Sequence, residues 1–249
     1  MKKSRQALKI LVVILIALMA IAVIYLNIFY RADESADNSL QNPVETVTVS
    51  TGDKAALIFE PSYENNAART GIIFYPGGKV ECSAYAPLME KLAQRGMTAV
   101  LVPMPGNLAI LDTNRAKGFK EAFSEIEDWY MAGHSLGGAA AAIHVAKNPD
   151  EYEGLILLGA YSTKDLSQDQ LPVLSIYGRE DEVMNREKYE ANKNFISSDL
   201  TEIEIAGGCH AYFGSYGEQK GDGTATITPE EQQTITADAI ADWIQNRAA

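Results

Sequence analysis

The sequence is poor in the residue types that most often bind metal ions. Only two cysteines, Cys82 and Cys209, and three histidines occur among its 249 residues. Because the two cysteines lie far apart, they lack the short spacing of a structural zinc site, and we expect no metal. A disulfide between them is compatible with a location outside the cytoplasm, and two buried thiols are the alternative.

Positive charge is also scarce. Lysine and arginine number 21 against 33 aspartates and glutamates, which gives a formal net charge of −12. Four of the basic residues lie within residues 1–9, so the rest of the chain is more acidic still. This balance argues against nucleic acid or an anionic lipid surface as the main partner.

One long apolar run lies near the N-terminus. Residues 1–9 are basic without an acidic residue, and residues 10–30 carry no charge. At about 1.5 Å per residue, the uncharged run reaches about 30 Å, the thickness of the hydrocarbon core of a bilayer. A signal peptide has a shorter apolar region of about 7–15 residues. We therefore predict a cytoplasmic basic segment over 1–9 and a transmembrane signal-anchor helix over 10–30, with cleavage near Ala32, Ser35 or Ala36 as the alternative.

The remainder of the chain is expected to lie outside the cytoplasm. A basic flank before an apolar run keeps the N-terminus in the cytoplasm, so we predict a single-pass protein of the cell membrane. Residues 31–43 are polar and acidic without apolar periodicity, which predicts a linker. Residues 44–249 are enough for one domain with a sizeable core.

Within this domain, short apolar strands alternate with helices. Two alternating segments, 44–49 and 55–59, flank Thr51-Gly52-Asp53 and predict an antiparallel hairpin. Further strands are expected at 71–75, 98–102, 128–132, 155–158, 173–177 and 201–205, and helices at 85–95, 117–126, 136–147, 186–194 and 229–247. The alternation predicts a three-layer α/β fold with a mostly parallel central sheet. The carboxyl ends of such strands carry the functional loops.

The most informative motif is GHSLG at residues 133–137, between a predicted strand and a predicted helix. It matches the pattern G-x-S-x-G, in which the serine sits on a strained turn and small neighbours let strand and helix approach. At the helix N-terminus, the N–H of Leu136 can face a developing oxyanion. Ser135 is therefore the predicted nucleophile, and a glycine-rich helix start with a serine cap is the alternative.

A serine hydroxyl needs a base to take its proton, and the three histidines allow a choice by elimination. His134 adjoins Ser135 on the turn, so its side chain should diverge from the hydroxyl, and His144 lies well inside the following helix. His210 follows a strand and a pair of glycines, which places it on a loop at the catalytic edge. We predict His210 as the base.

The acid that orients the imidazole should lie between the serine and the histidine in the chain. Carboxylates gather after the strand at 173–177, namely Glu180, Asp181 and Glu182. Asp181 directly follows the turn at the strand end and is the predicted acid. Glu180 and Glu182 stay open as alternatives.

The second oxyanion donor is expected from the loop after the strand at 71–75. That loop reads PGGK at residues 76–79. Pro76 has no N–H, so Gly78 is the predicted donor and Lys79 a further candidate, with an ordinary glycine turn as the alternative. Cys82 and Cys209 each lie close in sequence to a predicted site loop, so a disulfide between them would brace the site.

These residues resemble the α/β-hydrolase superfamily, and within it the small bacterial group often labelled α/β-hydrolase fold-5. The resemblance covers residues 44–249 and rests on YPGGKVE at 75–81, GHSLGG at 133–138 and HAYFG at 210–214. It implies an eight-stranded sheet, a triad of Ser135, Asp181 and His210, and no cofactor. Many members begin the oxyanion loop with His-Gly where this chain has Pro76-Gly77, a difference that leaves backbone donors in place.

The site is expected to be open. The family often inserts a lid where this chain has only residues 161–171 between two predicted strands, and eleven residues cannot form a lid domain. Tyr85, Phe213 and Tyr216 are candidates for its walls, and packing under the loops is the alternative.

The predicted function is a membrane-anchored, extracytoplasmic serine hydrolase that cleaves carboxylic esters through an acyl-enzyme. Its expected partners are a small ester or acyl substrate and the membrane, without nucleic acid. Acyl transfer or peptide hydrolysis by the same triad is a second interpretation. A non-catalytic binding domain on the hydrolase fold is a third, because fold alone does not imply function.

Overall fold

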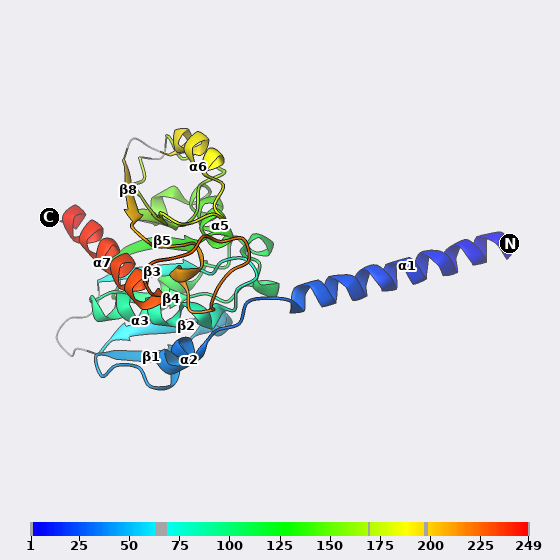
Figure 1. The fold of residues 1–249 in the computed structure, drawn as a ribbon, viewed down its shortest axis with the longest axis horizontal. Helices are drawn as coiled ribbons and strands as arrows, with labels where there is room; N and C mark the ends of the chain where they lie inside the picture. Colours follow the sequence, from blue (N-terminus) through cyan, green and yellow to red (C-terminus); the bar gives the residue numbers. More distant parts are fainter. Residues whose placement is uncertain (1, 63–68, 169, 197–198, 249) are drawn as a thin grey trace.

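The computed structural model describes residues 2–62, 69–168, 170–196 and 199–248. In this part of the chain, a mixed sheet of eight strands has the order β1-β2-β4-β3-β5-β6-β7-β8 (Figure 1). The strands are β1 (Val47–Thr51), β2 (Leu57–Pro61), β3 (Thr70–Tyr75), β4 (Thr98–Leu101), β5 (Asp128–His134), β6 (Gly154–Leu158), β7 (Val173–Gly178) and β8 (Leu200–Ile205). β1 and β2 pair antiparallel, and β3 to β8 run parallel. The predicted α/β sheet and its N-terminal hairpin are confirmed.

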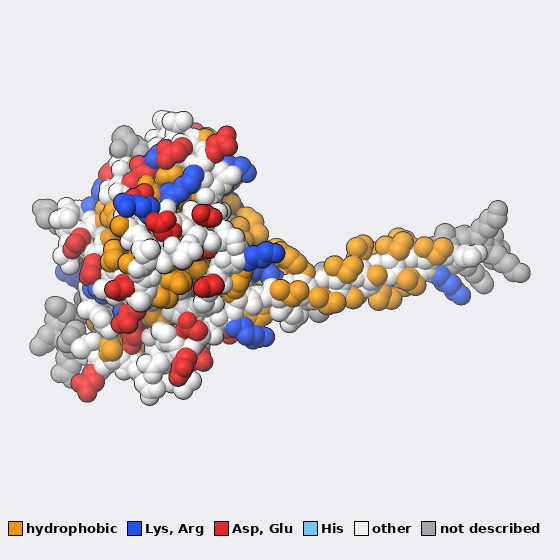
Figure 2. Space-filling view, viewed as in Figure 1, with side chains coloured by type: hydrophobic (Ala, Val, Ile, Leu, Met, Phe, Trp, Pro, Cys, Tyr) orange, Lys and Arg blue, Asp and Glu red, His pale blue; other side chains and the backbone are white. Residues whose placement is uncertain are grey.

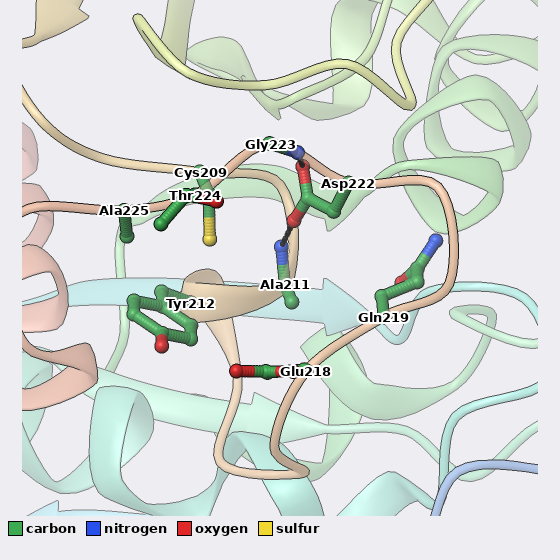
Figure 3. A pocket seen from close by; sticks show the side chains of 9 residues that line it. All are labelled: Cys209, Ala211, Tyr212, Glu218, Gln219, Asp222, Gly223, Thr224 and Ala225. Atoms are coloured by element: carbon green, nitrogen blue, oxygen red, sulfur yellow. Dashed lines mark hydrogen bonds between the residues drawn. The ribbon is translucent and has the colours of Figure 1, made fainter.

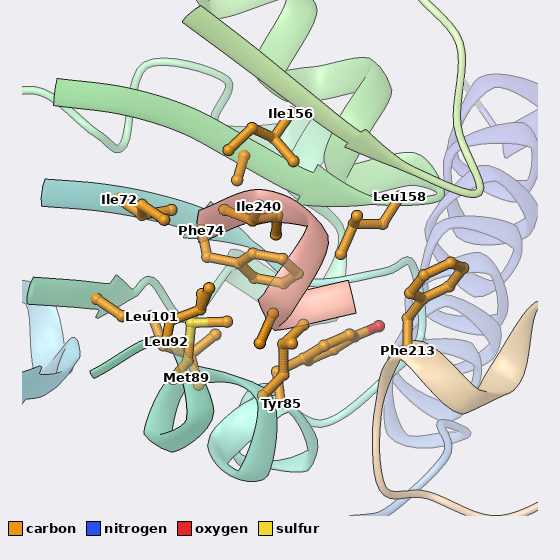
Figure 4. Packing of buried hydrophobic residues seen from close by; sticks show 14 of the residues in the cluster. Ile72, Phe74, Tyr85, Met89, Leu92, Leu101, Ile156, Leu158, Phe213 and Ile240 are labelled. Atoms are coloured by element: carbon orange, nitrogen blue, oxygen red, sulfur yellow. The ribbon is translucent and has the colours of Figure 1, made fainter. Parts of the chain in front are cut away.

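Helices cover both faces of the sheet. The helices of the described residues are α1 (Lys2–Asn27), which lies apart from the sheet, α2 (Glu34–Gln41), α3 (Ala86–Gln94), α4 (Phe119–Ala122), α5 (Leu136–Val145), α6 (Arg186–Asn192) and α7 (Pro229–Ala248). α3 and α7 pack on one face, where Ile240 of α7 meets Phe74 and Ile156 of the strands (Figure 4). α5 packs on the other face. The central sheet therefore lies between two helical layers.

The alternation of side chains along the strands explains why both faces need cover. Ile72 and Phe74 of β3 lie in the core beneath α3 and α7, whereas Ile73 lies in the core beneath α5. Successive residues of a strand point to opposite faces, so a run without polar side chains buries both. A strand of this kind suits the middle of a parallel sheet.

The helix predicted over 117–126 is wrong in length. The structure has only the single turn α4 (Phe119–Ala122) there, after Gly118 in the left-handed region at φ 93°. The apolar residues Phe119, Phe123 and Ile126 still pack into the core under α5. Their spacing therefore reflects burial of a short, irregular segment rather than a full helix.

α1 extends away from the domain as a lone helix (Figures 1 and 2). The described residues contain one helical stretch, Lys9–Asn27 of α1, that is long and apolar enough to cross a membrane. A signal sequence near the N-terminus has the same length and composition. Val13 and Met19 are 64% and 63% exposed, so the domain gives this helix no cover.

Residues 31–43 are not the free linker that the sequence predicts. They contain α2, which Asp33 caps by accepting hydrogen bonds from the N–H groups of Ser35 and Ala36. Ala36 is fully buried, and the hydroxyl of Ser39 donates to Glu90 Oε2 at 2.8 Å. The buried side chains of α2 are the small residues Ala36 and Ser39, and Leu40 packs on the core only in part, so the segment has little apolar periodicity.

The chain between α1 and α2 is also bound to the domain. Tyr30 forms a parallel bridge with Val80. The N–H of Tyr30 donates to the carbonyl of Lys79, and the N–H of Glu81 donates to the carbonyl of Tyr30, both at 2.8 Å. The loop after β3 therefore holds the segment that leaves α1.

Candidate active site

Ser135 lies on a sharp turn between β5 and α5. Its backbone has φ 52° and ψ −122°, a conformation that non-glycine residues rarely adopt. The turn needs small neighbours, because a Cβ on Gly133 would lie 2.5 Å from the carbonyl carbon of Gly137. The N–H of Ser135 donates to the carbonyl of Leu158 at 2.9 Å. The strand, strained turn and helix expected around Ser135 are therefore all present.

His210 and Asp181 form a buried pair on the loops after β8 and β7. His210 Nδ1 lies 2.8 Å from Asp181 Oδ2, and the two residues are 1% and 4% exposed. Asp181 Oδ1 accepts the N–H groups of Val183 and Met184 at 2.9 and 2.8 Å. These bonds orient the carboxylate so that Oδ2 faces the imidazole. The proton of a neutral His210 then sits on Nδ1, which leaves Nε2 as an acceptor.

Ser135 and His210 line the same cavity, which has a volume of about 370 Å³. Among the residues that the structure describes, His210 Nε2 has no hydrogen-bond partner, so the serine and the imidazole are not bonded to each other. Such bonds are often long before a substrate is bound. Most of the other lining side chains are apolar and come from α5 and from the loops after β6 and β7: Leu136, Ala139, Ala160, Val183 and Met184. An apolar substrate group therefore fits beside the serine.

Gly78 and Leu136 face each other next to Ser135. A Cβ on Gly78 would lie 2.8 Å from Leu136 Cδ2, so a larger residue here would displace the Leu136 side chain. Within the described residues, neither backbone N–H makes a hydrogen bond, so both can serve an oxyanion. Lys79 does not offer its N–H, because that group donates to the carbonyl of Asn107 at 2.7 Å. The expectation of Lys79 as a donor is therefore dropped.

The comparisons with known proteins agree with this geometry. A family model described as the alpha/beta hydrolase family matches residues 71–234. The chain belongs to the α/β-hydrolase family. Among curated proteins, none matches this sequence closely enough to count as a relative.

Several solved structures share the fold of this hydrolase. Est1E from Butyrivibrio proteoclasticus is 15% identical with a TM-score of 0.59, and the match covers 82% of this chain and 99% of that chain. The hydrolase MGS-MChE2, from a sediment metagenome of the lagoon of Mar Chica, is 16% identical with a TM-score of 0.58, covering 81% and 100%. A dienelactone hydrolase from Anabaena variabilis is 15% identical with a TM-score of 0.57, covering 81% and 98%. At these identities the likeness shows the fold alone.

His134 packs beside His210 and is hydrogen-bonded to Tyr85, so it contacts the residues of the hydrolase site without lining the cavity. Its Nδ1 accepts from the hydroxyl of Tyr85 at 2.7 Å, and that hydroxyl accepts the N–H of Gly77 at 3.0 Å. Its ring lies 4.5 Å from the ring of His210. Burial, and then the neighbouring His210, lower the pKa of His134 well below its usual value, so it stays neutral. Its side chain packs against Tyr85 and Phe213, and it is not among the residues that line the cavity of Ser135.

The other residues considered from the sequence lie away from the cavity. Tyr85 and Phe213 are fully buried and Tyr216 is 7% exposed, so they pack beneath the loops rather than line the site. His144 is buried and bonded to Tyr152 Oη at 2.9 Å, and burial lowers its pKa to about 4. Cys82 and Cys209, both among the described residues, are free thiols and do not form the disulfide considered from the sequence.

Asp222 is a residue of the site region that the sequence did not reveal. Its Oδ1 accepts the N–H of His210 at 3.1 Å, and its Oδ2 accepts the N–H of Ala211 at 2.8 Å. Oδ1 also accepts the N–H of Gly223 at 2.9 Å. Figure 3 shows this carboxylate among the side chains that line a second pocket, whose lining does not include Ser135. Asp222 therefore fixes the backbone that carries His210.

Proposed function

We propose that this hydrolase cleaves carboxylic esters with Ser135 as nucleophile, His210 as base and Asp181 as the acid that orients it. The observation that carries the proposal is His210, which lines the same cavity as the strained serine and whose acceptor nitrogen has no partner within the described parts of the chain. A serine becomes a useful nucleophile only beside such a base.

The chemistry follows from the positions of these groups. His210 Nε2 takes the proton of Ser135 while the serine oxygen attacks the acyl carbon of the ester. The N–H groups of Gly78 and Leu136 stabilise the oxyanion. Such electrostatic stabilisation is usually the largest single contribution to lowering the activation barrier. The bond to the alcohol oxygen then breaks, and His210 returns its proton to the departing alcohol. Water repeats the sequence on the acyl-enzyme and releases the acid.

The cavity favours esters over the alternatives. Most of its lining side chains are apolar and suit the acyl part of an ester, and Asn185 is the one amide among the lining residues that the structure describes. One fold relative is named as a dienelactone hydrolase, and a lactone is a cyclic ester. Acyl transfer by the same groups would need a bound acceptor that excludes water. Parallel assays of an ester, the matched amide and an added alcohol acceptor separate these outcomes.

We further propose that α1 anchors the hydrolase domain on the outer face of the cell membrane. The length and composition of Lys9–Asn27 support a span. The basic segment before it supports a cytoplasmic N-terminus. Protease protection of the intact cell, with an epitope at each end of the chain, tests this topology: a protected C-terminal epitope would contradict it.

A fluorophosphonate should label Ser135. This reagent forms a covalent bond with an activated serine, so we expect labelling of the full chain in detergent and its complete loss in Ser135→Ala. Ser167→Ala is the matched control, because it removes a serine hydroxyl that lies outside the cavity and donates to Asp165 at 2.6 Å. Labelling that persists in Ser135→Ala, measured by mass spectrometry, would overturn the proposal.

Replacing Asp222 by asparagine should weaken catalysis without removing a reacting group. An amide can accept through one oxygen only, so one of the N–H groups of His210 and Ala211 loses its acceptor. A shift of the imidazole by about 1 Å can cost about 100-fold in rate, and we expect a loss in kcat of about 10- to 100-fold. Asp165→Asn, at a solvent-exposed turn, is the control. Unchanged kcat with intact thermal stability would show that Asp222 does not position His210.

A further inference from the structure

The catalytic edge of the domain lies directly at the end of the apolar helix. Tyr30, three residues beyond α1, exchanges hydrogen bonds with Lys79 and Glu81 on the loop that follows β3. Gly78, the proposed oxyanion donor, is the neighbour of Lys79 in this loop. Because no free linker separates helix and domain, the orientation of the domain on a membrane would be fixed by these contacts.

Apolar surface continues from α1 onto the domain. Leu26 of α1 packs so closely on Gly106 that a Cβ there would lie 2.7 Å from Leu26 Cδ2. The next turn, η4 (Ala109–Leu111), buries Ala109 and leaves Ile110 and Leu111 49% and 60% exposed. Figure 2 shows the hydrophobic side chains of α1 reaching the domain, with basic side chains beside the junction.

The length of α1 gives the position of Ile110 and Leu111 relative to the membrane. The stretch Lys9–Asn27 has 19 residues, which at about 1.5 Å each span about 28 Å, close to the hydrocarbon thickness. Its far end therefore lies at the lipid–water interface, together with the residues it contacts. Lys79 lies over the ring of Tyr25 at 4.2 Å, and Arg31 over the ring of Phe29 at 4.9 Å. Aromatic rings with snorkelling cations are typical of that depth.

We propose that Ile110 and Leu111 dock in the outer surface of the bilayer, and that the hydrolase takes long-chain acyl esters of uncharged membrane amphiphiles as substrates. This inference rests on the proposed ester hydrolysis and anchoring. η4 packs on α5, whose first turn bears Leu136 and Ala139 of the catalytic cavity. An acyl chain leaving the bilayer beside η4 would meet an apolar cavity next to Ser135. The net charge of −12 disfavours anionic head groups.

A depth measurement tests the docking without using activity. A fluorophore is attached to Leu111→Cys in the full chain and, as the matched control, to Ile235→Cys, which replaces an exposed residue of α7. Both proteins are reconstituted in phosphatidylcholine vesicles with and without phosphatidylcholine brominated near the top of its acyl chains. The unsubstituted protein gives the background from Cys82 and Cys209. We expect loss of fluorescence at position 111 and none at 235; equal responses would overturn the docking.

A kinetic comparison tests the substrate class. The full chain in phosphatidylcholine vesicles is assayed on a long-chain monoacylglycerol in the bilayer and on a water-soluble butyrate ester. For the double variant Ile110→Ser/Leu111→Ser, we expect the ratio of bilayer to soluble rates to fall at least tenfold, because the two exposed apolar side chains that would enter the bilayer are lost. Ile235→Ser should keep the ratio. An unchanged ratio in the double variant would overturn the inference, whereas an enzyme inactive on both esters would overturn the proposed function instead.

Discussion

The variants Ser135→Ala and His210→Ala are each expected to lower kcat for a soluble ester by about 10,000-fold or more. The alanine at 135 removes the atom that forms the acyl-enzyme. The alanine at 210 removes the histidine that lines the cavity with Ser135, whereas His134 and His144 lie outside that lining and are bonded to Tyr85 and Tyr152. The double variant should be no slower than either single one, because neither group contributes without the other.

Asp181→Asn should cause a loss of similar size by a different route. Oδ1 of Asp181 is held by the N–H groups of Val183 and Met184, so the amide would turn its NH₂ toward His210. Nδ1 of His210 would then have to accept, and its proton would move to Nε2, which could no longer take the serine proton. The imidazole stays in place while its useful tautomer is lost.

Steady-state kinetics of the full chain in detergent, with circular dichroism to confirm folding, measure these effects. Glu182→Gln is the matched control: it removes the exposed neighbouring carboxylate and should change kcat by less than about twofold, as is usual for surface sites. Losses that add up in the Ser135→Ala/His210→Ala variant would contradict a shared mechanism. So would an Asp181→Asn enzyme close to wild type.

Local chemistry explains which parts could be predicted from the sequence. The turn at Ser135 imposes glycines at fixed spacing, and these are visible in the chain. His210 and Asp181 follow strands whose carboxyl ends meet at one edge of a parallel sheet, so their order in the chain was informative. These predictions depend on rules that act over a few residues or on the sheet as a whole.

Contacts between distant segments could not be predicted in this way. Asp222 lies in a loop without periodicity, and its function depends on where that loop folds against His210. The buried residues of α2 are Ala36 and Ser39, small side chains that carry little hydrophobic signal, with the partly buried Leu40 beside them. The engaged N–H of Lys79 depends on Asn107, from a different loop. In each case the residue acquires its partner only when the fold brings two distant segments together.

Replacing Gly137 by alanine should destabilise the domain by about 3 kcal/mol or more. A Cβ at this position would lie 2.2 Å from the carbonyl oxygen of Tyr75 and 2.3 Å from that of Pro76. Both atoms belong to the backbone at the end of β3, so no side chain can rotate away, and α5 must move. The free energy of unfolding of the full chain, from urea titration in detergent, measures the cost.

Gly96→Ala separates this clash from the conformational cost of losing a glycine. Gly96 has φ 84° but no atom within 4 Å of its added Cβ, so a cost of about 1–2 kcal/mol is expected from backbone conformation alone. Equal costs for the two variants would contradict the close approach of α5 to the end of β3. Because the chain that Gly137 contacts leads directly to Gly78, any shift that relieves the clash also moves the proposed oxyanion donor. Folded Gly137→Ala protein should therefore lose kcat as well as stability, while folded Gly96→Ala protein should keep its kcat.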